Sequence, residues 1–346
     1  MNSYISNSNM TDLNENNQKK DSIKFLKHGT VFLVFFIFTL VFYYLFCSYI
    51  ISIPLGSYAE ISERIDYKLE LAKEFDLPKI VLVSGSNSHF SLSAEKMQAE
   101  LDMPVFNFGT NASVYYHIFT LSKEILKKDD IVIANIEYPL FFCKKKTAFS
   151  PVRIGELYMI NSQEYSKRVS FLEKLNLKLL TGRDFVAWIN NNSFPDRDEL
   201  PDSSETINQN GDSKVNTVEN TDLTVLKGLV TDPIEFDNRR VQNFPETDCF
   251  EEIVKFKDWC HENEIQFYLS FPTVVKFDEY SNNEYQEIFQ KIITESEKAG
   301  IDIIGKPNDF MYPIDFFYNS GYHLNSKGRD INTDFVIELI RKIVEK

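Results

Sequence analysis

The sequence contains only four cysteines, and their positions predict no disulfide framework. Cys47 lies in a long apolar run, while Cys249 and Cys260 stand eleven positions apart on one expected helix, too far along its axis to bond. No Cys/His cluster has the spacing of a metal site, and no phosphate-binding glycine loop or internal repeat is present. The sequence therefore indicates neither a metal nor another cofactor.

Positive charge is also scarce. The chain has 37 lysines and arginines against 51 aspartates and glutamates, a net charge of −14 over 346 residues. An acidic protein repels a phosphate backbone, so nucleic acid is not an expected partner. The hydrophobic share of 43% is ordinary for a globular protein, and the length is sufficient for one large core with insertions.

One long segment contains neither a charge nor a proline. Residues 30–53 read TVFLVFFIFTLVFYYLFCSYIISI and are apolar on every face. About 20 such residues cross the hydrocarbon core of a membrane. A signal peptide and a buried core helix are the alternatives, but apolar signal regions are only about 7–15 residues long. We therefore expect a transmembrane helix over residues 29–53, which makes the membrane itself a partner.

The flanks of this segment predict its orientation. Lys19, Lys20, Lys24 and Lys27 precede the span, whereas residues 54–63 contain no lysine or arginine. Because positive flanks stay in the cytoplasm, we expect residues 1–28 to form a disordered cytoplasmic tail. The remainder of the chain is then extracytoplasmic, beginning with a stalk helix over residues 54–78.

From Lys79 onward, strands and helices alternate. Strands are expected at five short apolar runs, Ile80–Val83, Val105–Phe106, Ile131–Ala134, Gln266–Ser270 and Ile301–Ile304. Helices are expected at Ser93–Leu101, Ala112–Leu126, Thr247–Asn263, Glu284–Ala299 and Lys327–Val344. This pattern predicts an α/β domain over residues 79–346 with a parallel sheet covered on both faces. An insertion at about 144–245 interrupts it, with helices over 154–190 and a long polar loop over 191–222.

Polar residues follow the strands at the edge where parallel sheets bind ligands. Ser86 follows the first strand at a glycine turn, and His323 precedes the last helix. A serine nucleophile requires such a base, here distant in sequence. The backbone N–H groups of Ser86 and Gly109, with the Asn111 side chain, are candidate oxyanion donors. Glycine–serine loops and isolated histidines are also common as structural features, so this pattern alone leaves both readings open.

The order of three motifs resembles the SGNH (GDSL-like) hydrolase superfamily: SGSN at 84–87, NFG at 107–109 and HLN at 323–325. It resembles in particular the membrane-anchored members that handle acyl groups on cell-surface polymers, such as the alginate O-acetylation and teichoic acid D-alanylation proteins. The resemblance covers about residues 79–136 and 265–346. It implies a three-layer flavodoxin-like fold, with Ser86 as nucleophile, Gly109 in the oxyanion hole and His323 as base.

Two positions depart from the pattern of this family. The family usually carries an aspartate three or four residues before the histidine, where this chain has Ser320 and Asn319. Asn319 can fix the tautomer of His323 but cannot stabilise an imidazolium by charge. Glu137 stands roughly where the family has an asparagine, and a carboxylate would repel an oxyanion unless it points away or binds a substrate hydroxyl. Asp315 has the wrong spacing to serve as the acid.

The resemblance implies an extracytoplasmic serine esterase or O-acyltransferase acting on a cell-envelope glycan or polymer. The two departures favour an alternative, a catalytically inactive subunit that binds a glycan or assembles with a membrane-bound acyltransferase. A surface protein that stacks sugars on its aromatic residues is a third reading, although most aromatic residues at this frequency belong to the core.

The remaining candidates have simpler expected roles. We expect His89 to point to the loop surface, His117 to be packed or at a rim, and His261 to be structural at a helix end. The lysine run at 144–146 is expected to be a solvated loop.

Overall fold

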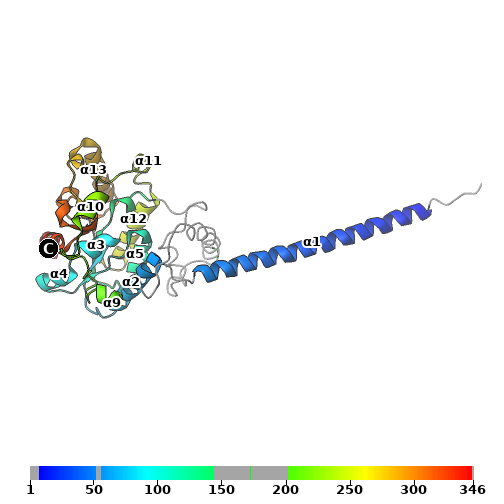
Figure 1. The fold of residues 1–346 in the computed structure, drawn as a ribbon, viewed down its shortest axis with the longest axis horizontal. Coiled ribbons are helices and arrows are strands. Elements are labelled where there is room, and N and C mark those ends of the chain that lie inside the picture. Colours follow the sequence, from blue (N-terminus) through cyan, green and yellow to red (C-terminus); the bar gives the residue numbers. More distant parts are fainter. Residues whose placement is uncertain (1–7, 52–55, 144–171, 173–201, 345–346) are drawn as a thin grey trace, which may run out of the picture. The chain divides into compact units, whose positions relative to one another are not determined.

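The computed structural model of the chain describes residues 8–51, 56–143, 172 and 202–344 (Figure 1). The chain divides into two compact units. One comprises residues 1–53 with 167–191, and the other comprises residues 54–166 with 192–346. The predicted helices at 154–190, apart from residue 172, and the lysine run at 144–146 lie outside the described residues.

The described part of the first unit is dominated by one uninterrupted helix, α1 (Ser8–Ile51) (Figure 1). Its segment Ile23–Phe46 is long and apolar enough to span a membrane, and none of that segment is buried in the protein. The tail prediction was wrong for residues 8–28, which are helical rather than disordered. Once the apolar segment is helical, each added residue extends an existing helix and needs no new nucleus.

A five-stranded parallel sheet forms the centre of the second unit. Its strands are β1 (Ile80–Val83), β2 (Val105–Asn107), β3 (Ile131–Asn135), β4 (Gln266–Ser270) and β6 (Asp302–Ile303), in the order β2-β1-β3-β4-β6. Every residue of β1 and β3 is buried. Because side chains alternate between the two faces of a strand, both faces of the sheet must be covered. The predicted α/β class with a parallel sheet is confirmed.

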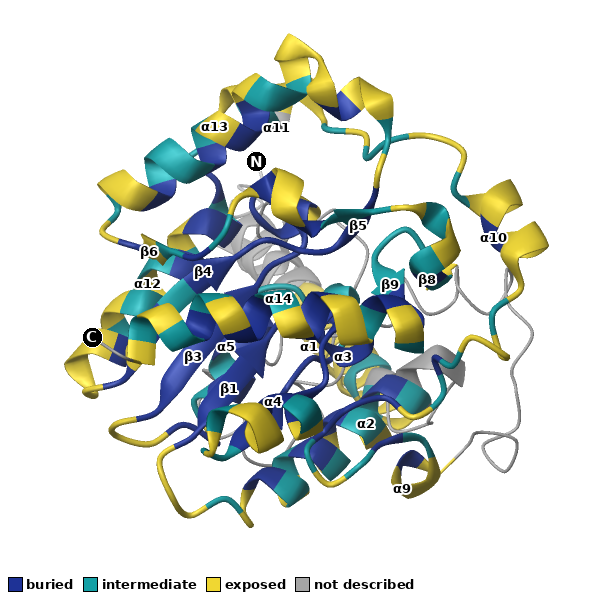
Figure 2. Ribbon diagram, turned by 90° about the vertical axis from the view of Figure 1, so that its left-hand side faces the viewer, coloured by how far each residue is buried: buried dark blue, intermediate teal, exposed yellow. Residues whose placement is uncertain are grey.

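Two groups of helices cover this sheet. Figure 2 shows β1 and β3 buried, with helices exposed on their outer sides. In one group α5 (His117–Ser122) contacts α12 (Asp248–Glu262), and in the other α14 (Ser326–Val344) contacts α3 (Ser86–Ser91) and α4 (Ala94–Leu101). α13 (Asn283–Lys298) packs against β6. From β1 the chain adds β2 on one side of the sheet and then β3, β4 and β6 on the other. Open α/β sheets bind ligands at such a switch point, here between β1 and β3.

Smaller elements complete the unit. Two short pairs of strands are β5 (Val274–Val275) with β7 (Met311–Tyr312), and β8 (Phe317–Ser320) with β9 (His323–Leu324). Short helices are α9 (Ser203–Thr206), α10 (Leu223–Leu229) and α11 (Asn238–Gln242). The 3₁₀ turns are η1 (Ala112–Val114), η2 (Tyr138–Leu140), η4 (Asp278–Ser281), η5 (Pro307–Phe310) and η6 (Ile314–Phe316). The helix expected at 112–126 is thus divided into η1 and α5.

The helix after the span, α2 (Gly56–Ala72), belongs to the domain and is not a separate stalk. Ile61, Ile65 and Ala72 lie in the hydrophobic core, and Lys68 is fully buried. These positions recur every three to four residues and so form one face of the helix. The stalk prediction was wrong because this face packs against the domain and does not face solvent.

The polar loop prediction was also wrong for residues 202–222. This segment contains α9 and a bridge between Ile207 and Ser213, and several of its polar side chains are buried. Gly211 has φ +84°, and a Cβ atom there would lie 2.3 Å from the Asn107 carbonyl oxygen. Glycine therefore permits the close approach of this segment to β2, whose Asn107 N–H donates to the Asn210 carbonyl over 2.8 Å.

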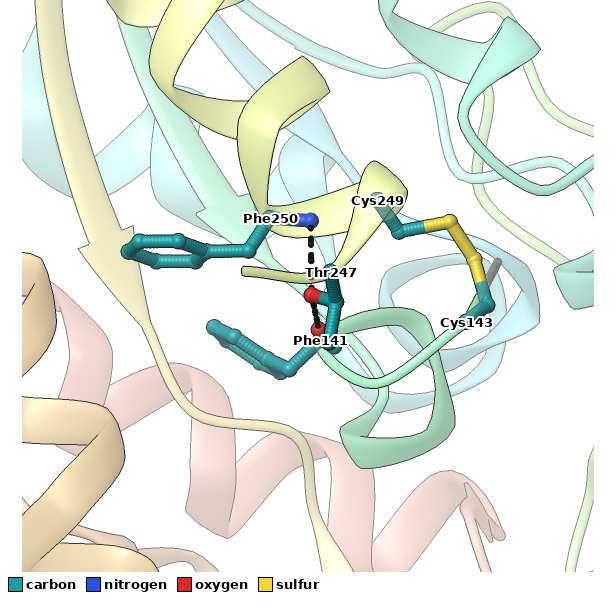
Figure 3. The surroundings of a disulfide bond; sticks show 5 residues. All are labelled: Phe141, Cys143, Thr247, Cys249 and Phe250. Atoms are coloured by element: carbon teal, nitrogen blue, oxygen red, sulfur yellow. Dashed lines mark hydrogen bonds between the residues drawn. A yellow bond between two sulfur atoms is a disulfide. The ribbon is translucent and has the colours of Figure 1, made fainter. Parts of the chain in front are cut away.

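Cys143 and Cys249 form a disulfide, with Cα atoms 5.3 Å apart (Figure 3). Cys143 lies after η2, in the segment that follows β3, and Cys249 lies in the first turn of α12. Thr247 reinforces the same junction, since its hydroxyl donates to the Phe141 carbonyl over 2.6 Å. This single bond is not a disulfide framework, but it was not predicted, because it joins residues 106 positions apart, a relationship that spacing along one helix cannot show.

Candidate active site

The candidate nucleophile lies at a tight turn between β1 and α3. Ser86 is the first residue of α3 and is 9% exposed. A Cβ atom on the preceding Gly85 would lie 2.4 Å from Glu137 Oε1 and 2.7 Å from the backbone of Ala112. Any side chain at this position would clash, so only glycine lets the Ser86 turn pack directly against the segments that follow β2 and β3.

The β8–β9 hairpin brings His323 to this turn. His323 Nε2 lies 2.7 Å from Ser86 Oγ, and His323 Nδ1 lies 2.7 Å from Asn319 Oδ1. The imidazole packs against the Phe90 ring with centroids 4.3 Å apart. The structure thus brings together the three residues predicted for nucleophile, base and orienting partner. Asp315 is not part of this group and instead pairs with Lys227.

Burial, together with the nearby positive charge of Arg64, lowers the pKa of His323 from 6.5 to about 3. The imidazole is therefore neutral at pH 7. With an N–H on Nδ1 donating to Asn319 Oδ1, Nε2 carries the lone pair that can accept the Ser86 proton. The arrangement can activate a hydroxyl, although it contains no carboxylate to stabilise the imidazolium that results.

Glu137 lies behind the nucleophile turn. Its carboxylate oxygens accept hydrogen bonds from the N–H groups of Gly85 over 3.0 Å and Asn87 over 2.9 Å, and it also faces the N–H of Ser86. Burial raises the pKa of Glu137, an effect partly opposed by these N–H groups. The carboxylate is thus held against the backbone of the turn that carries Ser86.

The Gly109 N–H, predicted as an oxyanion donor, bonds to a side chain of the domain instead. The Gly109 N–H donates to Asn107 Oδ1 over 3.0 Å, and the residue is buried against the backbone of His89. Asn111 uses its Oδ1 to accept from the N–H and hydroxyl of Ser113. The Nδ2 group of Asn111 remains as a candidate donor, because the adjoining Ala112 lies against Gly85.

A buried polar cluster supports the loop after β2. Lys68 Nζ donates to the carbonyl oxygens of Asn107 over 2.9 Å and Gly109 over 2.7 Å, and lies 3.1 Å from His89 Nδ1. Burial, together with Arg64, lowers the pKa of Lys68 well below 10.5. The pKa of His89 is also well below 6.5, through burial and the charge of Lys68. His89 is therefore a core residue, and its expected surface position was wrong.

Sequence reasoning missed Lys68 and Arg64, although a signal existed. Lys68 falls on the apolar stripe of α2, three residues after Ile65 and four before Ala72. A lysine in such a stripe must find hydrogen-bond partners, and here they are two carbonyl oxygens at the candidate site.

The other two histidines of the second unit, outside the site, were expected to be structural. His117 was expected to be packed or at a rim, and it is buried in α5. His261 was expected at a helix end, and it lies in the last turn of α12.

No protein-family model matches the chain, and no curated protein matches it either. The resemblance to the SGNH superfamily therefore rests on the residues named above. Within the described ranges, no group of three or more His, Cys, Asp or Glu residues could hold a metal ion.

Proposed function

We propose that the protein is a membrane-anchored, extracytoplasmic serine esterase or O-acyltransferase that acts on a cell-envelope glycan or polymer. The observation that carries the proposal is the chain of contacts from Ser86 Oγ to His323 Nε2 and from His323 Nδ1 to Asn319. Serine nucleophiles of acyl-transfer enzymes are activated by a base held in this way.

The extracytoplasmic location is supported by two features of the chain. The lysines before the apolar part of α1 favour a cytoplasmic N-terminus. The Cys143–Cys249 disulfide is typical of proteins outside the reducing cytoplasm.

In the proposed reaction, Ser86 Oγ attacks the carbonyl carbon of an ester while its proton passes to His323 Nε2. The tetrahedral intermediate collapses, the alcohol leaves with the proton from Nε2, and an acyl-serine remains. Water or a sugar hydroxyl then attacks the acyl-serine, again giving its proton to Nε2. The bond between the acyl carbon and Oγ breaks, the proton passes from Nε2 to Oγ, and the carboxylic acid or the acylated sugar leaves. Asn319 holds the tautomer, and Asn111 Nδ2 is the candidate donor to the oxyanion.

Hydrolysis of p-nitrophenyl acetate by the full-length chain tests this proposal. We expect a burst of p-nitrophenol and an acetyl adduct on Ser86, both lost in Ser86→Ala. Ser204→Ala is the control, because Ser204 is an exposed residue of α9. Equal activity in Ser86→Ala and the wild type would eliminate Ser86 as the nucleophile.

A second candidate is a non-catalytic subunit that binds a glycan or assembles with a membrane-bound acyltransferase. The position of Glu137 favours it, because a buried carboxylate beside the Ser86 turn opposes the formation of a nearby negative charge. This candidate predicts that the wild type forms no acyl adduct, while Glu137→Gln leaves binding of the polymer unchanged.

A further inference from the structure

Asn216 joins the two elements that carry the candidate catalytic pair. Its Nδ2 donates to the carbonyl oxygens of Phe90 and Leu324, each over 2.7 Å, and the residue is 1% exposed. Phe90 lies four residues after Ser86 in α3, and Leu324 follows His323 directly in β9. Both N–H groups of one side-chain amide are therefore used to connect the nucleophile helix to the histidine strand.

Both carbonyl groups need such a partner. Phe90 lies in the last turn of the six-residue helix α3, where carbonyl groups have no donor within the helix. Leu324 ends the two-residue strand β9. Two short elements with few hydrogen bonds of their own are thus held by an external side chain.

The segment that carries Asn216 is itself fixed. The Ser213 N–H donates to the His89 carbonyl over 3.3 Å, and Arg329 of α14 donates to the Ser213 carbonyl over 2.8 Å and to Asn216 Oδ1 over 3.5 Å. At its other end Asp212 accepts from the N–H groups of Ala94 and Glu95 over 2.8 and 3.0 Å. Asn216 therefore projects from a segment that is bound to α3, α4 and α14. It can fix the positions of the Phe90 and Leu324 carbonyl groups relative to each other.

We propose that Asn216 is a positioning residue that sets the Ser86–His323 hydrogen bond by tying α3 to β9. The inference rests on the proposed function for its effect on rate, and on the geometry alone for its effect on the hydrogen bond. Misplacing a reacting group by about 1 Å can reduce a rate by about 100-fold. Loss of the Asn216 amide is expected to reduce acylation without weakening the first encounter with a ligand.

The test uses the full-length chain in detergent with Asn216→Leu, which keeps the branched shape of the side chain but replaces the amide by two methyl groups and so removes both donors. Asn216→Ser is a milder second variant that can still donate to one carbonyl. Asn220→Leu is the matched control, since Asn220 is exposed and its Nδ2 donates only to the nearby Val215 carbonyl over 2.9 Å. Circular dichroism selects variants that keep the wild-type secondary structure.

The first measurement is the ¹⁵N NMR spectrum of histidine-labelled protein, which is simple because the chain has five histidines. We expect the His323 Nε2 resonance to move in Asn216→Leu, to move less in Asn216→Ser and to stay unchanged in Asn220→Leu. The second is inactivation by a fluorophosphonate. We expect the maximal rate to fall about 10- to 100-fold in Asn216→Leu with the half-saturating concentration unchanged.

The two proposals fail in different ways. A wild-type chain that the fluorophosphonate does not label counts against the proposed function, and the NMR measurement then decides the role of Asn216 alone. A His323 resonance identical to the wild type in folded Asn216→Leu or Asn216→Ser would overturn the positioning role, whether or not Ser86 reacts.

Discussion

His323 Nδ1 lies 2.7 Å from the side-chain oxygen of Asn319, an amide at a position where an acidic partner would stabilise an imidazolium. The contact fixes the orientation of the imidazole but supplies no negative charge. Burial and the charge of Arg64 lower the pKa of His323 to about 3, and no carboxylate in this contact opposes them. The base is neutral over a wide pH range, and its protonated form is poorly stabilised.

Asn319→Asp should therefore increase the proposed esterase activity. A carboxylate at this position would favour the imidazolium and raise the pKa of His323, so the acid limb of the pH–rate profile should move to higher pH. The expected gain in turnover is on the order of 100-fold, a part of the roughly 10⁴-fold that the reverse change costs in serine proteases. Asn319→Ala, which removes the orienting contact, is the comparison. An Asp variant no faster than the wild type would contradict the prediction, and an Ala variant as fast as the wild type would exclude an orienting role for this position.

The lowered pKa values of His89 and His323 should make the protein sensitive to acid. The pKa values of His89 and His323 are lowered in the folded state, so between pH 6.5 and about 3 the unfolded state binds more protons. Stability is therefore lost as pH falls through this window. His89→Gln should reduce the slope of unfolding free energy against pH by up to roughly 1.4 kcal/mol per pH unit. Urea unfolding of both chains from pH 7 to pH 4 measures this, and equal slopes would contradict it.

The buried pair of Lys79 and Asp130 should be essential for stability. Lys79 Nζ lies 2.8 Å from Asp130 Oδ2, and both side chains are fully buried. Lys79→Met leaves the Asp130 carboxylate without a cation, which typically costs about 3–5 kcal/mol. Lys128→Met is the matched control, because Lys128 pairs with Glu264 on the surface and its loss should change little. Thermal unfolding compares them, and similar melting temperatures for the two variants would refute the prediction.

The disulfide should stabilise the domain, because it closes a loop of 106 residues in the unfolded chain. Removing such a bond costs about 2–5 kcal/mol. Cys249→Ser should therefore unfold at lower urea than Cys260→Ala, in which a free buried thiol is lost. Mass spectrometry of unreduced peptides checks the pairing. Alkylation of both Cys143 and Cys249 in the native, unreduced protein would show that they are not bonded.

The sequence predicted correctly the strands whose side chains are buried in the hydrophobic core. The runs at β1 and β3 are apolar throughout because both faces of these strands are buried. The 202–222 segment was read as a loop because polar side chains normally face water. Asn216 and Asp212 instead satisfy backbone groups inside the domain. The residue type alone does not show whether a polar side chain faces water or bonds to backbone groups inside the domain.

The candidate site shows the same division. Ser86 and His323 could be singled out because the order of the SGSN, NFG and HLN motifs is visible in the sequence. The role expected of Gly109 depends on which way one N–H points, and the Asn107 side chain decides that direction. Glu137 could be located beside the turn, but its contacts with Gly85 and Asn87 depend on backbone geometry.

Labelling of the full-length chain with a fluorophosphonate, followed by peptide mapping, tests the catalytic proposal most directly. The proposal predicts one adduct, on Ser86, that disappears in Ser86→Ala and falls sharply in His323→Ala. A wild-type chain that stays unlabelled beside a reactive serine hydrolase in the same tube would contradict it, as would an adduct on any other serine.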